Sequence, residues 1–192
     1  MRTSTGLLLA AMFLLLQACA IQPPTWKATS NERYVSSKQG FSAELPPGWI
    51  QISSHDESST LVSANGPELD LITLLRRDNA KAFPGTKKEA SPTELPGDLA
   101  ADFIAESKTE GNSNVQVVTN EPATLAGKDG FRVVMEFTTS SGVHYRSESY
   151  AVCTMDGFYA LIYRAPVLHY YDLYEPAFKS VVASFQLVPH AL

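Results

Sequence analysis

The sequence predicts an α+β fold in which helices pack on an antiparallel β-sheet. Most of the chain beyond residue 40 consists of short apolar segments with a period of two, separated by turns rich in glycine, proline and aspartate. Helical spacing of apolar residues occurs only near residues 96–111 and 170–185. With 192 residues, 44% of them hydrophobic and 18% charged, the chain suits one domain with a full-sized core.

The first 18 residues are typical of a secretory signal peptide. Arg2 precedes an apolar run over residues 7–16, which is shorter than the roughly 20 residues that a bilayer-spanning helix needs. The sequence Leu-Gln-Ala-Cys at residues 16–19 resembles the lipobox of bacterial lipoproteins. The resemblance implies cleavage before Cys19 and attachment of acyl chains to that cysteine, which anchor the protein permanently to a membrane.

Two alternatives to this anchor stay open, namely an ordinary secreted protein cut after Ala18 or Ala20, and an uncleaved membrane anchor. Ala20 occupies the position where, in the lipoprotein family, an aspartate retains a Gram-negative lipoprotein in the inner membrane. We therefore expect a lipid-anchored protein of the bacterial cell envelope, at the outer membrane and facing the periplasm. Only Cys153 then remains as a thiol of the mature chain, so no intramolecular disulfide can form.

The mature chain is expected to consist of a lipidated tether over residues 19–33 and a single domain over residues 34–192. Residues 40–52 are predicted to form a β-hairpin around Pro46-Pro47-Gly48, and residues 61–64 and 69–75 two further strands.

A polar stretch over residues 76–96 is interpreted as a surface loop. A helix is then predicted to begin at Pro96 and to end before Gly111, with Leu99 and Phe103 on its apolar side. Strands follow at residues 115–118, 124–127 and 131–137, with a turn at residues 128–130 between the last two.

A hairpin with a defined register is predicted next. Ser140-Ser141-Gly142 suits a short hairpin loop, with glycine at the position that needs a positive φ. If Thr139 pairs with Val143, then Glu136 lies opposite Arg146, and the rings of Phe137 and Tyr145 also lie opposite each other. Both pairs are favourable, and they agree on one register.

The last strand, residues 158–163, is apolar on both faces and is therefore expected near the centre of the sheet. A terminal helix follows over residues 170–185, interrupted or restarted near Pro176. Its core-facing side is predicted from the spacing of Phe178, Val181, Val182 and Phe185.

The order of these pieces resembles the PsbP-like fold and, within it, the bacterial DcrB-like lipoproteins. The resemblance rests on residues 40–49, on the turn and strand start at residues 125–131, and on the final Ser184-Phe185, and it extends over about residues 34–187. It implies an α/β/α sandwich built on an antiparallel sheet. Members of the fold include photosystem subunits, a partner of a nuclear-transport GTPase and secretion-related adaptors, so the resemblance implies protein binding without a mechanism.

Charge and motifs exclude several classes of function. The formal net charge is −5 and there is no basic run, so we expect no binding of nucleic acid. The sequence contains no Gly-x-Ser-x-Gly, phosphate-binding glycine loop or Cys-x-x-Cys, so we expect neither an enzyme nor a cofactor. The histidines show no ligand spacing, so we expect no metal; they are His55, His144, His169 and His190.

Three further residues with reactive side chains are interpreted as structural. Cys153 lies within a strand and is expected to be a buried, inert thiol. Asp70 and Glu148 resemble an acid/base pair, but the alternation of the sheet favours solvent-facing positions for both.

A group of aromatic residues near the last strand is the candidate protein-binding surface. It consists of Arg164, His169, Tyr170, Tyr171 and Tyr174, with Tyr159 and Tyr163 nearby. Tyrosine and arginine are enriched at protein interfaces, although tyrosines can equally line a strand–helix junction. The leading interpretation is a non-enzymatic envelope lipoprotein that binds another, unidentified envelope protein as an accessory subunit or adaptor. The alternatives are an immunity protein against a periplasmic toxin and a carrier of a small ligand or lipid, for which the many large side chains leave little room.

Overall fold

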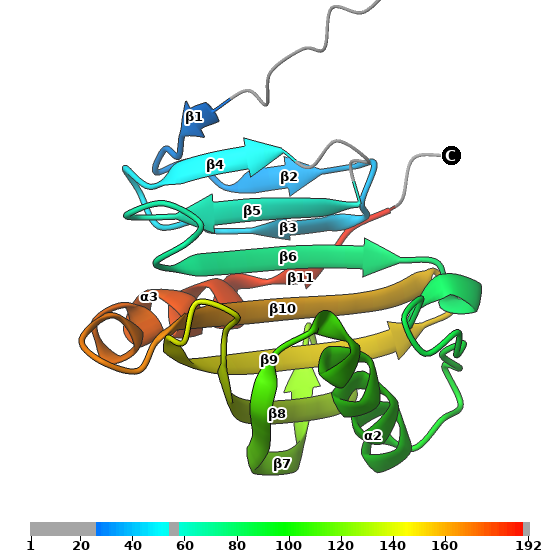
Figure 1. Ribbon diagram of the computed structural model, residues 1–192. Helices are drawn as coiled ribbons and strands as arrows, with labels where there is room; N and C mark the ends of the chain where they lie inside the picture. Colours follow the sequence, from blue (N-terminus) through cyan, green and yellow to red (C-terminus); the bar gives the residue numbers. More distant parts are fainter. Residues whose placement is uncertain (1–25, 54–57, 190–192) are drawn as a thin grey trace, which may run out of the picture.

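The computed structural model describes residues 26–53 and 58–189, which form a large antiparallel sheet with further elements on both faces (Figure 1). The sheet has eight strands in the order β1-β4-β5-β6-β10-β9-β8-β7. These strands are β1 (Trp26–Ala28), β4 (Ile50–Ser53), β5 (Ser59–Ser63), β6 (Leu71–Arg77), β7 (Ser113–Leu125), β8 (Lys128–Thr138), β9 (His144–Thr154) and β10 (Gly157–Pro166). The predicted signal peptide, Cys19, His55 and His190 lie outside the described residues.

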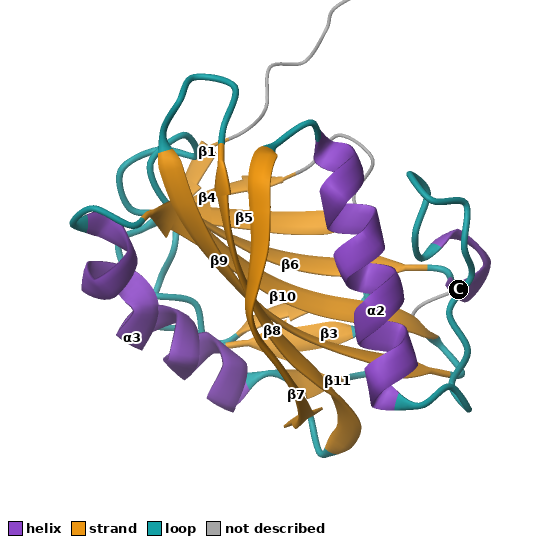
Figure 2. Ribbon diagram, turned by 60° about the horizontal axis from the view of Figure 1, so that its bottom comes forward, coloured by secondary structure: helices purple, strands orange, loops and turns teal. Residues whose placement is uncertain are grey.

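The remaining elements cover the two faces of this sheet (Figure 2). Helix α2 (Pro96–Ser107), followed by the 3-10 turn η3 (Lys108–Glu110), lies on one face and packs on β7 and β8. Helix α3 (Tyr170–Ser184) lies on the other face with a three-stranded sheet of β2 (Tyr34–Ser36), β3 (Phe41–Ala43) and β11 (Gln186–Leu187). The short 3-10 turn η2 (Asn79–Lys81) follows β6. The predicted α+β class, an antiparallel sheet with helices packed on it, is confirmed.

Strand β10 lies near the centre of the sheet and joins the two cores. Its odd-numbered residues, such as Leu161 and Tyr163, belong to the core under α3, whereas Phe158 and Ala160 belong to the core under α2. Both faces of the strand are therefore buried, as its apolar composition predicts. Its neighbours are β6 and β9.

The predicted hairpin of β8 and β9 is confirmed in its register. Glu136 lies opposite Arg146, and Phe137 lies opposite Tyr145. The Thr139 amide donates to the carbonyl of Val143 at 2.9 Å, which closes the loop as predicted. The two rings are stacked with centroids 5.9 Å apart, and the Arg146 guanidinium donates two hydrogen bonds to the Glu136 carboxylate at 2.6 and 2.9 Å.

Both predicted helices are present with the predicted apolar sides. In α2, Leu99 and Phe103 are buried, and Gly111 ends the following turn with φ 80°, as a left-handed cap requires. The prediction of a break near Pro176 is wrong, because α3 runs through it without interruption. Pro176 lacks the amide donor for one helical hydrogen bond. The residues after it nevertheless continue the helix as far as Ser184.

The hairpin predicted over residues 40–52 is wrong. β3 pairs with β2 and β11 in the small sheet, whereas β4 pairs with β1 and β5 in the large one. The chain passes from one sheet to the other through Pro46-Pro47-Gly48, where Gly48 has φ 77°. All residues of β3 are buried, because the small sheet is packed against the large one. A period of two identifies a strand but does not choose its partner.

Three boundaries also differ from the predictions. Residues 115–127 do not form two strands; they belong largely to the single strand β7, and the turn to β8 is Ala126-Gly127, with φ 51° and 70°. The stretch over residues 76–96 is only partly a surface loop, because Ala82, Phe83 and Ala90 are buried beneath α2. The segment expected as a tether contributes β1, which pairs with β4, so the sheet already begins at Trp26.

Candidate functional site

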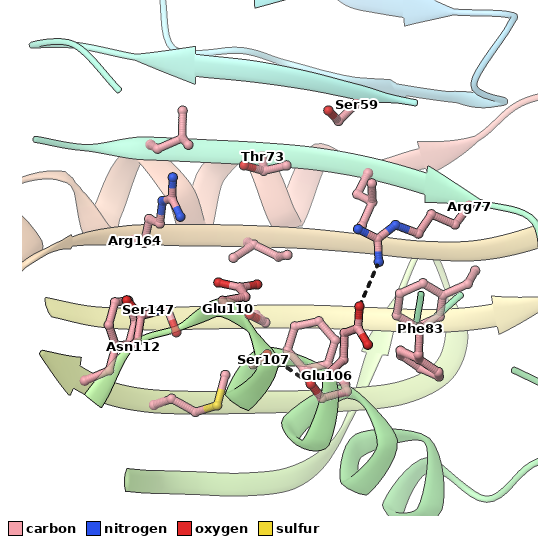
Figure 3. A pocket seen from close by; sticks show the side chains of 18 of the residues that line it. Ser59, Thr73, Arg77, Phe83, Glu106, Ser107, Glu110, Asn112, Ser147 and Arg164 are labelled. Atoms are coloured by element: carbon pink, nitrogen blue, oxygen red, sulfur yellow. Dashed lines mark hydrogen bonds and ion pairs between the residues drawn. The ribbon is translucent and has the colours of Figure 1, made fainter. Parts of the chain in front are cut away.

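A cavity of about 460 Å³ lies on the α2 face of the large sheet (Figure 3). β8, β9 and β10 form its floor, β5 and β6 form one wall, and α2, η3 and the start of β7 form the other. The cavity exists because α2 packs on β7 and β8 and leaves the middle of this face open. Its size falls within the range of about 300–1,000 Å³ that is typical of small-molecule sites.

Small side chains on β9 deepen the floor of this cavity. Residues Ser147 and Ser149 point toward α2, whereas Glu148 and Tyr150 between them point to the other face, toward α3. Ser147 lies opposite Arg164 on β10, and Ser149 lies opposite Ile162. Because successive residues of a strand point to opposite faces, an alternation of serine with large residues hollows one face and fills the other.

One end of the cavity is closed by a polar network. The Glu106 carboxylate accepts hydrogen bonds from the amides of Gly85 and Thr86 at 2.9 and 2.8 Å. It also lies 4.0 Å from the Arg77 guanidinium, which donates to the carbonyl of Ala82 at 2.9 Å. These charged groups hold the loop before α2 against the sheet, so they are already occupied with structural contacts (Figure 3).

The other end is open and carries two charged groups, Arg164 and Glu110 (Figure 3). Within the described part of the chain, neither side chain makes a hydrogen bond or an ion pair shorter than 4.0 Å. Desolvation by the cavity walls raises the pKa of the Glu110 carboxyl, and the charge of the Arg164 guanidinium opposes this effect. Arg164 and Glu110 also line a second hollow of about 500 Å³ at the loop end of the sheet, which is the end that carries the β5–β6 turn and the β8–β9 loop.

The Ser149 hydroxyl is the one polar side-chain group of the cavity floor that is completely buried and unsatisfied among the described residues. Buried hydroxyls in proteins almost always have a hydrogen-bond partner. This hydroxyl faces the cavity between Ile162 and Val133, which offer none. The cavity floor therefore contains one buried hydroxyl without a hydrogen-bond partner among the described residues.

The candidate surface predicted from the aromatic residues is divided by the structure. Arg164 lies on the α2 face and belongs to the cavity, whereas Tyr171 is 3% exposed and lies in the core under α3. Tyr170 and Tyr174 are half-buried at the start of α3, and His169 is exposed, with its ring 5.1 Å from that of Tyr170. The structure therefore does not bring these residues together into one surface.

The interpretation of Asp70 and Glu148 as solvent-facing residues is wrong, because both are completely buried. The Asp70 carboxylate accepts hydrogen bonds from the amides of Ala64 and Asn65 at 2.7 and 2.9 Å and so closes the turn between β5 and β6. Glu148 lies under α3, on the face opposite to the cavity, where Arg132 and Lys179 pair with it. Each carboxylate thus has a structural role.

Cys153 is half-buried, and its thiol lies 3.3 Å from the amide oxygen of Asn79. Burial raises the pKa of this thiol to about 11, so it carries little negative charge at neutral pH. Among residues 26–53 and 58–189, no cluster of three or more histidine, cysteine or acidic side chains could hold a metal ion. No helix in the same residues combines the length and apolar content of a membrane span.

Comparison with solved structures identifies the fold. The solution structure of cyanobacterial PsbP from Synechocystis is similar with a TM-score of 0.58 at 13% identity, over 90% of this chain and 99% of that one. The Ran-binding protein Mog1p of Saccharomyces cerevisiae is similar with a TM-score of 0.55 at 8% identity, over 84% of this chain and 97% of that one. A protein of unknown function from Pseudomonas aeruginosa has a TM-score of 0.51 at 13% identity, over 85% of this chain and 100% of that one.

This chain is therefore an α+β protein with one large antiparallel sheet between helices, and it has the PsbP-like fold. The predicted PsbP-like fold is confirmed, and the narrower resemblance to DcrB-like lipoproteins stays a prediction. No family model matches the sequence, and no curated protein matches it. At these identities the similarity shows the fold and assigns no function, because one fold hosts many functions.

Proposed function

We propose that this chain is a non-enzymatic lipoprotein of the bacterial envelope that binds another envelope protein as an accessory subunit or adaptor. The observation that carries the proposal is a set of exposed apolar side chains at the loop end of the sheet. Leu168 is 86% exposed, and Leu173, Val143 and Leu69 are also exposed. Exposed apolar residues that gather at one place on a soluble domain are typical of protein interfaces.

Three loops bring these side chains to one end of the molecule. The Val167 amide donates to the carbonyl of His144 at 3.0 Å, which joins the loop before α3 to the β8–β9 hairpin. The Tyr145 hydroxyl donates to the carbonyl of Glu68 and so joins the same hairpin to the β5–β6 turn. The side-chain amide of Asn65 in this turn donates to the Tyr174 hydroxyl at 2.7 Å, which adds the first turns of α3.

The roles of the other candidate groups support binding rather than catalysis. Asp70 closes a turn, Glu148 is paired with two cations, and the raised pKa of the Cys153 thiol makes it a poor nucleophile at neutral pH. Groups held in this way are not available as a nucleophile or as a general acid or base.

The test is crosslinking in cells, followed by purification of the full-length protein and mass spectrometry of the proteins recovered with it. The Leu168→Glu variant places a charge in the proposed surface. Met155→Glu is the matched control, because Met155 is 84% exposed in the β9–β10 turn at the opposite end of β10. We expect one dominant envelope protein that is recovered with the wild type and with Met155→Glu, and at least tenfold less with Leu168→Glu.

Equal recovery with both variants would contradict the proposed surface, and recovery of no envelope protein would contradict the adaptor role. A secreted toxin as the dominant partner would contradict the adaptor role as well and would favour the immunity protein. The α2-face cavity favours a small-ligand carrier as a second candidate function, because its volume suits a small molecule.

A further inference from the structure

The buried Ser149 hydroxyl indicates that the α2-face cavity is a binding site for a small molecule. The side chain is 0% exposed and its oxygen has no partner among the described residues. It lies in the cavity floor, two residues along β9 from Ser147, which itself lies opposite Arg164. Ser149 therefore lies about 7 Å along the strand from the backbone of the Ser147–Arg164 pair, which is the length of two residues.

The charges at the cavity mouth define the polar part of the ligand. Arg164 and Glu110 both line the cavity, and neither is paired within the described residues. A ligand with only a negative charge would be attracted by Arg164 and repelled by Glu110. A ligand with only a positive charge would be attracted by Glu110 and repelled by Arg164. A zwitterionic head satisfies both, because its carboxylate pairs with the guanidinium and its ammonium group with the carboxylate.

The remainder of the cavity defines the apolar part. Beyond Ser149, toward the closed end, the lining is formed by Leu75, Phe103 and Phe158. The charged groups at that end, Arg77 and Glu106, are occupied with each other and with the backbone of residues 82–86. A volume of about 460 Å³ accommodates a molecule the size of an amino acid.

We propose that this cavity binds a free α-amino acid with a large apolar side chain. Its carboxylate lies at Arg164, its ammonium group at Glu110, and one polar atom of the head forms a hydrogen bond with Ser149. The side chain lies among Leu75, Phe103 and Phe158. The site adjoins the proposed protein-binding surface, because Leu69 and Val143 line the same hollow as Arg164 and Glu110. The two proposals use different side chains, so the calorimetry below and the crosslinking above test them separately.

Isothermal titration calorimetry of the full chain carrying Cys19→Ala, which needs no detergent, tests the ligand class. The probes are L-phenylalanine, phenethylamine, which lacks the carboxylate, 3-phenylpropionate, which lacks the amine, and glycine, which lacks the apolar group. We expect L-phenylalanine to bind at least tenfold more tightly than each of the other three. Absence of binding by L-phenylalanine and by L-leucine would overturn the proposal. Equal binding of 3-phenylpropionate would also overturn it and would indicate an anionic amphiphile.

Variants assign the site to these residues. Arg164→Gln is expected to weaken the binding of L-phenylalanine at least tenfold, so that L-phenylalanine no longer binds more tightly than phenethylamine. Glu110→Gln is expected to remove the difference in affinity between L-phenylalanine and 3-phenylpropionate. Ser149→Ala is expected to weaken the binding of L-phenylalanine several-fold. The matched controls Lys128→Gln and Glu89→Gln remove exposed charges outside the cavity and should leave binding unchanged. Binding unaffected by Arg164→Gln and Glu110→Gln would overturn the assignment to this cavity.

Discussion

The Glu148 carboxylate can be completely buried because two cationic side chains pair with it. It is completely buried under α3, where Arg132 and Lys179 pair with it and Tyr171 donates a hydrogen bond at 3.3 Å. Burial raises the pKa of Glu148, but the hydrogen bonds from Lys179 and Arg132 outweigh this effect and lower the pKa below its ordinary value. The cluster ties β8 and β9 to α3.

Replacement of Glu148 by glutamine is expected to lower the free energy of unfolding by about 2 kcal/mol at pH 7, because charged hydrogen bonds are replaced by neutral ones. A lowered folded-state pKa stabilises the protein above the unfolded pKa of about 4.3, and this stabilisation is lost as the pH falls through the folded-state pKa. Urea unfolding at pH 7 and at pH 3 measures both effects. The difference between wild type and variant should shrink at pH 3, and a difference independent of pH would contradict the charge pairing. Glu89→Gln is the control.

The Cys153 thiol is expected to react slowly with iodoacetamide. Its pKa is raised from 9.0 to about 11 by burial, which lowers the thiolate fraction at pH 7.5 roughly 100-fold. The reaction of the folded Cys19→Ala protein, followed by intact-mass spectrometry, should therefore be at least 100-fold slower than that of the same protein in urea. Equal rates would show that the thiol is accessible and ionised.

At the scale of elements, the tight turn between β7 and β8 sets the register of a long strand pair. Leu125 lies opposite Lys128, and the two residues between them both have positive φ, as type I′ turns require. Glycine occupies only the second of these positions. The first is alanine, whose Cβ makes a left-handed backbone unfavourable.

Substitutions in this turn are expected to shift stability in opposite directions. Gly127→Ala should lower the free energy of unfolding by about 1 kcal/mol, because it places a Cβ on a left-handed residue. Ala126→Asn should raise it by about 0.5 kcal/mol, since asparagine tolerates that conformation. The control is Gly97→Ala in helix α2, where the new Cβ has no atom within 4 Å. This change should not lower the free energy of unfolding. Thermal unfolding measures all three, and destabilisation by Ala126→Asn would contradict the turn geometry.

Among the elements, the register of the β8–β9 hairpin was predictable from the sequence, whereas the pairing partners of β3 and β4 were not. Its register depends on pairs such as Glu136 with Arg146 that are close in sequence, and a glycine marks its loop. β3 and β4 show the same alternation, but their partners come from β11 near the end of the chain and from β5 and β1. No local pattern contains that choice.

At the scale of the whole molecule, we expect a lipid on Cys19 to determine where the protein resides. The wild type should label with palmitate and stay in the membrane fraction after a high-salt wash, because several acyl chains bind a bilayer in effect irreversibly. Cys19→Ala should lose the label and appear in the soluble periplasmic fraction, whereas the control Cys153→Ala should behave as the wild type. A Cys19→Ala protein that remained with the membrane would contradict the lipobox.

The sequence by itself determined the α+β class, the central position of β10 and the apolar sides of α2 and α3, because periods of two and of 3.6 residues are local properties of the chain. The alternation of serine with large residues at 147–150 was also visible, and it could have pointed to a hollow face of β9. Only the tertiary structure decided that α2 leaves this face open, that Glu148 is buried with Arg132 and Lys179, and that Arg164 and Glu110 share one cavity mouth. Each of these features joins residues from separate elements, so it depends on how the elements pack.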